Sequence, residues 1–424
     1  MTVENLSTRD KKHLWHPLTQ HKLNKRQLAI VRAKDALLFD EDGKEYIDGI
    51  ASWYTVMYGH SNKYIVSAMT KQMNKLDFVM FSGLTHEPAI ELSEKLMEIL
   101  PENQAKIFFN DNGSTAIEAA IKMALQFYHN KGELRDTLIA FEDGFHGDTF
   151  GAMSASGLSS YNGPFEDFLL KVVRIPTPQD DNIDEVKNLL THILKKNKCA
   201  AFVFEPLVQG AAGMRFHSTK GLDELIDICQ KNNVLSIADE IMTGFGKTGK
   251  NFASDYLENK PDIICLSKAL TAGMFPLSIT SCSQVVFNRF LSDEVHKGFF
   301  HAHTFSAHPI GCVAALAGIE LLNSPEIIER RKYIESAHIS FATRIENHEK
   351  VGNVRVKGVI LAIDLSKQME RYGNLRDDLY EFFVARGVLL RPLGNTIYVL
   401  PPYVITNSQL QKIYKTIIAA LETF

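Results

Sequence analysis

Two polar residues, Asp239 and Lys268, each follow a short apolar run, 234–238 in the first case and 263–266 in the second. A carboxylate at the end of a buried strand can pair with a heterocycle nitrogen and favour its protonated form. An amine between apolar and small residues loses solvation, so its pKa falls and it attacks an aldehyde more readily. Taken singly, an Asp-Glu pair is more often a turn or a helix cap, and a lysine is more often on the surface.

A third group, Gly113-Ser114-Thr115, opens a stretch whose apolar residues recur at helical spacing. The N–H groups and positive dipole end of such a helix can hold a phosphate, and the glycine permits close approach. An isolated Gly-Ser-Thr is more often an ordinary helix cap. A phosphate-type helix start, a strand-end aspartate and a strand-end lysine together are what a pyridoxal-phosphate site requires.

Two further apolar runs end in polar or glycine positions, at 145–147 and at Glu205. Ligands of an open α/β sheet bind beyond the carboxyl ends of its strands, so these positions belong to the same region. We expect His146 and His303 to be loop histidines that bond to backbone. Glu205 fits a carboxylate behind the site and a turn equally well. Neither H-x-x-x-H spacing nor a carboxylate cluster indicates a metal site.

The elements that must position these residues alternate between strands and helices. Apolar positions at 3.6-residue spacing predict helices over 116–128 and 222–229. The strand-like runs are short and apolar, as expected for strands covered on both faces, and lie at 106–109, 137–141, 200–204, 234–238, 263–266 and 277–281. This alternation predicts an α/β fold with a mostly parallel sheet and helices on both faces.

Both ends of the chain show a different pattern. Residues 36–46 predict a hairpin that turns at Asp42-Gly43, because Asp-Gly between β-prone runs signals a tight turn. The C-terminal part predicts a helix, then a strand at 359–364, a helix at 375–385, paired strands at 388–391 and 396–400, and a terminal helix from about 408. We expect a small α+β domain built from both termini, with the limits 1–59, 60–310 and 311–424.

Composition narrows the classes of partner and compartment. The 424 residues carry a formal net charge of −4, which gives no electrostatic case for nucleic acid or an anionic membrane. Mean hydropathy is −0.10, and no run of about twenty apolar residues is present to span a bilayer. The five cysteines are scattered, odd in number and free of C-x-x-C spacing, which argues against a disulfide framework or a zinc site. We expect a cytoplasmic protein whose substrates are small molecules.

The segments around Asp239 and Lys268 resemble the signature of class III pyridoxal-phosphate aminotransferases, and the resemblance covers essentially the whole chain. They are 237–249, IADEIMTGFGKTG, and 267–273, SKALTAG. Within the class, the chain is most similar to the branch that converts 8-amino-7-oxononanoate to 7,8-diaminononanoate in biotin synthesis. The matching pieces are Trp15-His16-Pro17, Ser52-Trp53, Gly144–Thr149, His303-Thr304-Phe305, Arg391–Gly394 and Pro401-Pro402-Tyr403. The resemblance implies a fold-type I transferase.

The resemblance implies pyridoxal 5′-phosphate as the cofactor, with a role for each matching residue. Lys268 would hold it as a Schiff base and move the proton between substrate and cofactor. Asp239 would hold the ring nitrogen, and Phe145 would stack on the ring.

The resemblance also implies a phosphate site shared between two subunits. Gly113 and Ser114 of one subunit would bind the phosphate together with Thr304 from the other. Ala302 and His303 would lie beside it. A shared site of this kind implies an obligate homodimer.

For the substrates, the resemblance implies a pocket walled by Trp53 and Tyr54. Arg391 would grip the carboxylate of 8-amino-7-oxononanoate by a two-point contact. The same resemblance adds further residues to the substrate site, namely Leu18, Phe145, Lys268 and Ala302.

Three departures from the family pattern concern the amino donor. The chain has Leu18 and Phe145 where the family commonly has tyrosine, and Lys247 where it commonly has arginine. These changes remove two hydroxyls, one flat surface and one planar cation. We expect S-adenosylmethionine as the donor, with lysine as the alternative. The other hypotheses are an ω-aminotransferase acting on ornithine or a polyamine, and a catalytically silent binding protein on the same fold.

Overall fold

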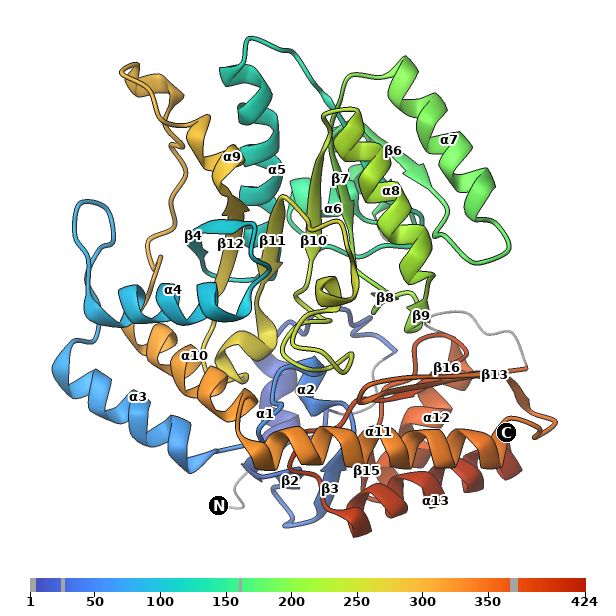
Figure 1. The fold of residues 1–424 in the computed structure, drawn as a ribbon. Helices are drawn as coiled ribbons and strands as arrows, with labels where there is room; N and C mark the ends of the chain where they lie inside the picture. The colour runs from blue at the N-terminus through green and yellow to red at the C-terminus, as the bar shows by residue number, and fades with distance from the viewer. Residues whose placement is uncertain (1–4, 24–26, 160–161, 367–372) are drawn as a thin grey trace.

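The chain is built around a seven-stranded sheet with the strand order β4-β12-β11-β10-β7-β5-β6 (Figure 1). The computed structural model describes residues 5–23, 27–159, 162–366 and 373–424. The strands are β4 (Gln104–Asn110), β5 (Thr137–Phe141), β6 (Val172–Ile175), β7 (Cys199–Phe204), β10 (Leu235–Asp239), β11 (Ile263–Leu266) and β12 (Ser278–Ser283). Five of them are parallel, and β12 is antiparallel to both of its neighbours. The predicted α/β fold is confirmed.

Helices cover both faces of this sheet, which explains why its strands are short and apolar. Ile237 on β10 lies in the core that the sheet forms with α5 (Gly113–Asn130). The next residue, Ala238, lies in the core on the opposite face, together with residues of α8 (Thr219–Lys231). A strand buried on both faces needs apolar residues at successive positions rather than at alternate ones.

The other helices that accompany the sheet are short to medium in length. They are α3 (Lys63–Lys75), α4 (Glu87–Ile99), α6 (Phe150–Ala155), α7 (Ile183–Lys196), α9 (Gln284–Asn288) and α10 (Pro309–Leu322). Four 3-10 turns are η1 (Gly163–Phe168), η2 (Ala253–Tyr256), η3 (Lys268–Thr271) and η4 (Val295–Lys297), and a small ribbon pairs β8 (Val208–Gln209) with β9 (Arg215–Phe216). The cofactor lysine of the prediction thus opens η3, directly beyond β11.

Segments from both ends of the chain lie side by side in a second, smaller unit (Figure 1). One of its sheets joins β1 (Ile30–Lys34), β2 (Leu37–Asp40) and β3 (Glu45–Asp48) to β15 (Val388–Leu389). The other joins β13 (Val351–Lys357), β14 (Ile360–Leu365) and β16 (Thr396–Val399). The helices here are α1 (Leu6–His13), α2 (Ala51–Tyr54), α11 (Pro325–Ile345), α12 (Asn374–Ala385) and α13 (Asn407–Thr423). The small α+β unit from both termini is confirmed, whereas its limits at 59 and 310 stay predictions.

The predicted hairpin at 36–46 is confirmed by the antiparallel pairing of β2 with β3. The predicted pairing of 388–391 with 396–400 is wrong. Strand β15 pairs with β3, and β16 pairs with β14, with an isolated bridge between Leu393 and Thr396. Pro392 has no N–H to donate to a ladder, so residues 390–395 form a loop that carries Arg391.

Two findings bear on the expected cellular setting. Across the described residues, no single helix is both long and apolar enough to cross a membrane. The pair α10 and α11 meets the length and composition test jointly, but the two helices are bent by 68° at their junction. All five cysteines are free and buried, as expected for reduced thiols in an apolar core.

Candidate active site

The start of α5 is shaped to receive an anion. Asn112 caps the helix: its side-chain oxygen accepts from the N–H of Thr115 at 3.1 Å, and the Thr115 hydroxyl oxygen accepts from the N–H of Asn112 at 3.1 Å. The first helical hydrogen bond runs from the N–H of Ala116 to the carbonyl of Asn112. The N–H groups of Gly113 and Ser114 therefore have no helical acceptor and lie at the positive end of the helix dipole.

Gly147 closes one side of this helix start. Its φ is +129°, and a Cβ at this position would lie 2.1 Å from Oγ of Ser114. Only glycine allows the 145–147 loop to approach α5 so closely. A Cβ on Gly113 would lie 3.1 Å from the side chain of Ile241, so the other side is tight as well. The backbone thus forms a narrow cradle around the free N–H groups.

Asp239 ends β10 and is 3% exposed. Its Oδ2 bonds to Nδ1 of His146 at 2.7 Å, and its Oδ1 accepts from the N–H of Ile241 at 3.1 Å. Burial alone would lower the pKa of His146, but the hydrogen bond and the charge of Asp239 outweigh it, so the pKa is raised. The expectation that this histidine side chain bonds to backbone is wrong, because the nearest strong acceptor is a buried carboxylate.

Glu205 lies behind the same region and is a carboxyl group that orders backbone. Its two oxygens accept from the N–H of Phe145 at 3.0 Å and from the N–H of Gly210 at 2.8 Å. Burial raises its pKa to about 7, with His146 acting in the opposite direction. Of the two roles that the sequence left open for Glu205, the structure supports the carboxylate behind the site.

Lys268 follows β11 with a left-handed backbone, φ +49°. Its amine lies over the ring of Tyr54, with Nζ 5.2 Å from the ring centroid. Burial lowers its pKa, and the charges of Asp239 and Glu205 act in the opposite direction. Within the described residues, this amine has neither a hydrogen bond nor an ion pair. A desolvated amine without a protein partner is suited to react with a carbonyl group.

Trp53, which directly precedes Tyr54 in the sequence, lies against the side chain of Arg391. The guanidinium carbon of Arg391 lies 5.1 Å from the centroid of the Trp53 ring. Among the described residues, Arg391 has no carboxylate partner, so its planar fork is available to an anionic ligand. Trp53 is 44% exposed, whereas its neighbour Tyr54 is 4% exposed. The two aromatic residues thus link the lysine to a cation that can receive a carboxylate.

Other predicted site residues are not brought to this region within one chain. Leu18 is 52% exposed and lies outside the contacts described above. Ala302 and Thr304 are exposed as well. Nε2 of His303 bonds to Nε2 of His301 at 3.2 Å, so the expectation that this side chain bonds to backbone is wrong here too. Their roles stay predictions, and those of 302–304 concern a site on a second subunit.

Lys247, one of the three departures from the family pattern, is fully buried. Its amine donates to the carbonyl of Gly244 at 2.9 Å. Burial lowers its pKa far below the usual value, and the nearby Lys268 charge acts in the same direction. In this conformation the amine is directed toward its own loop and is not available to a substrate carboxylate.

Three residues near Trp53 in the chain or the fold have no role predicted from the sequence: Asp48, His60 and Ser52, which is named above only as part of a matching piece. They form a hydrogen-bonded group at the end of β3. A signal was present, because Asp48 directly follows the apolar run of β3 and is fully buried. Its partner His60 lies twelve positions further on, which no local pattern indicates.

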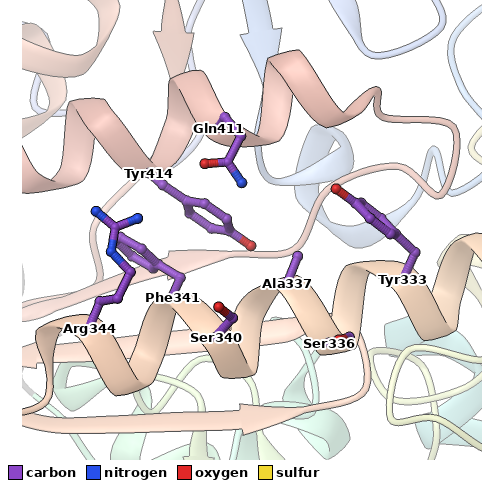
Figure 2. Close-up of a pocket in the computed structure, with 8 residues that line it drawn as sticks. All are labelled: Tyr333, Ser336, Ala337, Ser340, Phe341, Arg344, Gln411 and Tyr414. Atoms are coloured by element: carbon purple, nitrogen blue, oxygen red, sulfur yellow. The ribbon is translucent and has the colours of Figure 1, made fainter.

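A separate hollow of about 240 Å³ lies between α11 and α13 (Figure 2). Its lining includes Tyr414, whose hydroxyl already bonds to His338 at 2.7 Å, and Phe341, which stacks on Tyr414 at 4.2 Å. None of the predicted site residues lines it. The hollow is a groove between packed helices and adds nothing to the candidate active site.

Comparison with known proteins places the chain in a family. The sequence model described as aminotransferase class-III matches residues 19–421. The adenosylmethionine-8-amino-7-oxononanoate aminotransferase of Synechococcus elongatus is 43% identical over 97% of this chain and 98% of its own. The protein of the same name from Staphylococcus aureus is 34% identical over 96% and 95%.

Solved structures agree. The adenosylmethionine-8-amino-7-oxononanoate aminotransferase of Methanocaldococcus jannaschii superposes with a TM-score of 0.93 at 32% identity, over 98% of both chains. An omega transaminase from Pseudomonas jessenii, solved in complex with PMP, has a TM-score of 0.92 at 26% identity, over 99% of this chain and 98% of its own. From the family match and the full-length relatives it follows that this chain belongs to the class III aminotransferases, which depend on pyridoxal phosphate.

Proposed function

We propose that this enzyme transfers an amino group to 8-amino-7-oxononanoate and so forms 7,8-diaminononanoate in biotin synthesis. The observation that carries the proposal is the aromatic wall of Tyr54 and Trp53, which links Lys268 to Arg391, an arginine without a carboxylate partner among the described residues. The acceptor has a carboxylate at one end, a long aliphatic chain, and a ketone near the other end. The site offers matching groups in the same order. Arg391 can receive the carboxylate, the rings of Trp53 and Tyr54 can line the aliphatic chain, and the cofactor site at Lys268 can receive the ketone.

The residues present fit pyridoxal phosphate. The cradle of Gly113, Ser114 and Gly147 offers free N–H groups with no side chain in the way, as a phosphate requires. Asp239 is a buried carboxylate that can hold a protonated ring nitrogen. The cofactor, when bound, supplies an aldehyde that reacts with amines and a ring that accepts the electron pair released at the neighbouring carbon.

Lys268 is the proposed proton carrier. Because burial lowers its pKa, a larger fraction of its amine is neutral near pH 7 than for an exposed lysine. A neutral amine can take the proton from the substrate carbon that bears nitrogen and return it to the carbon on the other side of that nitrogen. Tyr54, which packs against the amine, limits its movement and keeps it on one face of the site.

His146 supports Asp239 in this scheme. Its Nδ1 bonds to the carboxylate, and its raised pKa favours the imidazolium form. This bond fixes the orientation of the Asp239 carboxylate, which can then hold a protonated ring nitrogen. Glu205 holds the backbone of Phe145, which we propose stacks on the ring.

S-adenosylmethionine is the amino donor that we propose, with lysine as the alternative. The names of the full-length relatives support the first donor. The exposed Leu18 and the inward-directed Lys247 support neither, because one lacks a ring for stacking and the other is buried. The donor is therefore the part of the function that most needs measurement.

A homodimer is also proposed, with the partner subunit's Thr304 completing the phosphate site. Segments 78–84 and 300–305 support it. Phe78 packs on Phe305 at 5.2 Å, and large apolar side chains around them are exposed, among them Met80 at 60% and Phe300 at 73%. An apolar surface of this kind is typical of a subunit interface. The compartment that we propose is the cytoplasm, which agrees with five free, buried cysteines.

The test separates the two half-reactions. The purified enzyme is mixed with S-adenosylmethionine, lysine, ornithine or a polyamine, one at a time, and loss of the bound cofactor's visible absorption is followed. Enzyme converted by a donor is then given 8-amino-7-oxononanoate, and 7,8-diaminononanoate is measured by mass spectrometry. Formation of the diamine from the first donor supports the full proposal. Conversion by ornithine or a polyamine without turnover of this ketone would replace it with a different ω-aminotransferase.

A further inference from the structure

The short element α2, a single turn that carries Trp53 and Tyr54, has an unusual backbone. Four successive residues other than glycine have positive φ: Ala51 (+47°), Ser52 (+44°), Trp53 (+70°) and Tyr54 (+69°). Bonds from the N–H of Tyr54 to Ile50 and from the N–H of Thr55 to Ala51, both 2.9 Å, close it as one left-handed helical turn. L-residues other than glycine disfavour this conformation, so something else in the structure must hold it.

A buried group of hydrogen-bonded side chains stabilises this left-handed backbone. The Ser52 hydroxyl donates to Oδ2 of Asp48 at 2.7 Å, and Nε2 of His60 bonds to the same oxygen at 2.8 Å. The other oxygen, Oδ1, accepts from the N–H of Ile50 at 3.3 Å. The Asp48 side chain is fully buried and that of His60 is 13% exposed. We name Asp48, Ser52 and His60 the Asp48 clasp.

The same strand end also fixes the segment that leads to Arg391. Asp48 pairs with Leu389 in the register of β3 and β15, and the N–H of Gly49 donates to the carbonyl of Leu389 at 3.1 Å. A Cβ on Gly49 would lie 2.6 Å from the Leu390 side chain, so the two segments are in close contact. The end of β3 at Asp48 therefore positions both the left-handed turn and the start of the loop that carries Arg391.

From these contacts we infer that the Asp48 clasp is a positioning group for the substrate pocket. It holds the left-handed turn so that Trp53 lies against Arg391 while Tyr54 lies under the Lys268 amine. None of the three clasp residues touches the reacting atoms; each acts through the backbone of the turn. The inference rests on the proposed function only where it assigns the pocket to the carboxylate-bearing acceptor. The geometry of the clasp is independent of that assignment.

The chain offers a direct reporter of the turn, because it contains two tryptophans, Trp15 and Trp53. Trp15 is 90% exposed, so Trp15→Phe leaves Trp53 as the single emitting tryptophan with little structural change. In that background, Asp48→Asn and Ser52→Ala should shift the Trp53 emission and increase its quenching by acrylamide. The KM for 8-amino-7-oxononanoate should rise about tenfold, as expected for loss of a hydrogen bond to a charged group. The maximal rate should change by a smaller factor than KM does, and the visible absorption of the bound cofactor should stay close to that of the parent.

A matched pair of variants at one position separates the clasp from backbone strain. Ser52→Gly and Ser52→Ala both remove the hydroxyl, but glycine accepts a left-handed backbone without cost. If the clasp acts as inferred, Ser52→Gly should keep more of the parent's Trp53 emission than Ser52→Ala does. If Asp48→Asn does not fold, the two Ser52 variants still test the inference, because they remove only one hydroxyl group.

Two outcomes would overturn the inference. In the first, Asp48→Asn and Ser52→Ala lower the melting temperature but leave the Trp53 emission and the ketone KM unchanged, which makes the clasp a purely structural feature. In the second, the maximal rate falls in parallel with cofactor absorption while KM is unaffected, which places the effect at the cofactor. If the parent enzyme does not turn over the ketone at all, the proposed function fails, and the Trp53 emission still decides whether the clasp holds the turn.

Discussion

The two halves of the active site are built in different ways. The cofactor half, which contains Gly113, Asp239 and Lys268, consists of the ends of regular elements, one helix start and two strand ends. The substrate half, which contains Trp53 and Arg391, consists of a left-handed turn and a loop. The strands that bring these two segments together pair Asp48 with Leu389, which lie 341 positions apart in the sequence.

The difference lies in how each half is held in place. Strand and helix ends present a side chain through backbone geometry that the local sequence already favours, so the cofactor half needs little further support. A left-handed turn costs about 1–2 kcal/mol for each residue other than glycine, and remote contacts must offset that cost. Changes in the cofactor half should therefore alter chemistry, and changes in the substrate half should alter which substrates fit.

Replacement of Lys268 by alanine should have the largest effect. Transamination should fall by about 10⁴-fold or more, because the chain loses both its nucleophile and its proton carrier. The bound cofactor should also lose its characteristic visible absorption. Thermal stability should not fall, since the folded chain no longer contains a desolvated amine.

Lys247→Met is the matched control for this variant, because Lys247 is another lysine whose pKa is lowered by burial, and it is fully buried. It should keep the cofactor absorption. If Lys247→Met removed the absorption and Lys268→Ala kept it, the assignment of the cofactor lysine would be reversed.

In the substrate half, Arg391→Ala should lower kcat/KM for 8-amino-7-oxononanoate by about 30–100-fold, mainly through KM, since a two-point charged contact is lost. Arg391→Lys should recover part of this loss, because it keeps the charge without the planar fork. Initial-rate kinetics with the ketone as the varied substrate measure both. An equal loss with a ketone that has no carboxylate would show that Arg391 acts on the fold and not on the substrate.

The same contrast explains what the sequence could predict. Strand ends at Asp239 and Lys268 follow from short apolar runs that are specific to buried strands, and the helix start at Gly113 follows from periodicity. The left-handed turn was not predictable, because Ala51 to Tyr54 contains no glycine to signal positive φ. The parallel pairing of β15 with β3 was missed for a related reason, since local pattern indicates a strand but not its distant partner.

Gly147→Ala tests whether the cofactor half depends on close backbone approach. The new Cβ would lie 2.1 Å from Oγ of Ser114, so the loop or the helix start must shift. We expect a loss of about 1–3 kcal/mol in stability and weaker binding of pyridoxal phosphate. Gly132→Ala is the control, because Gly132 also has positive φ, +76°, but has open space around the added methyl group. Thermal unfolding and cofactor titration of the two variants separate crowding from backbone strain; equal losses in both would mean that the cradle is not tight.

A last expected effect leaves catalysis aside and concerns Glu205 and the dependence of apoenzyme stability on pH. Its pKa is raised from an ordinary 4.5 to about 7 by burial, so the folded state binds a proton more tightly than the unfolded state does. The unfolding free energy should therefore fall as pH rises from 4.5 to about 7, and this contribution should be constant above that. Glu205→Gln removes the ionisation, and the decline over this interval should shrink by about 3 kcal/mol. Urea unfolding at several pH values measures this change in the unfolding free energy.

His146 adds a second titration with a raised pKa, so its stabilising proton is lost at higher pH, above 6.5. A decline that is unchanged in Glu205→Gln would therefore assign this interval to a different group, and the carboxyl behind Phe145 would then be ionised throughout.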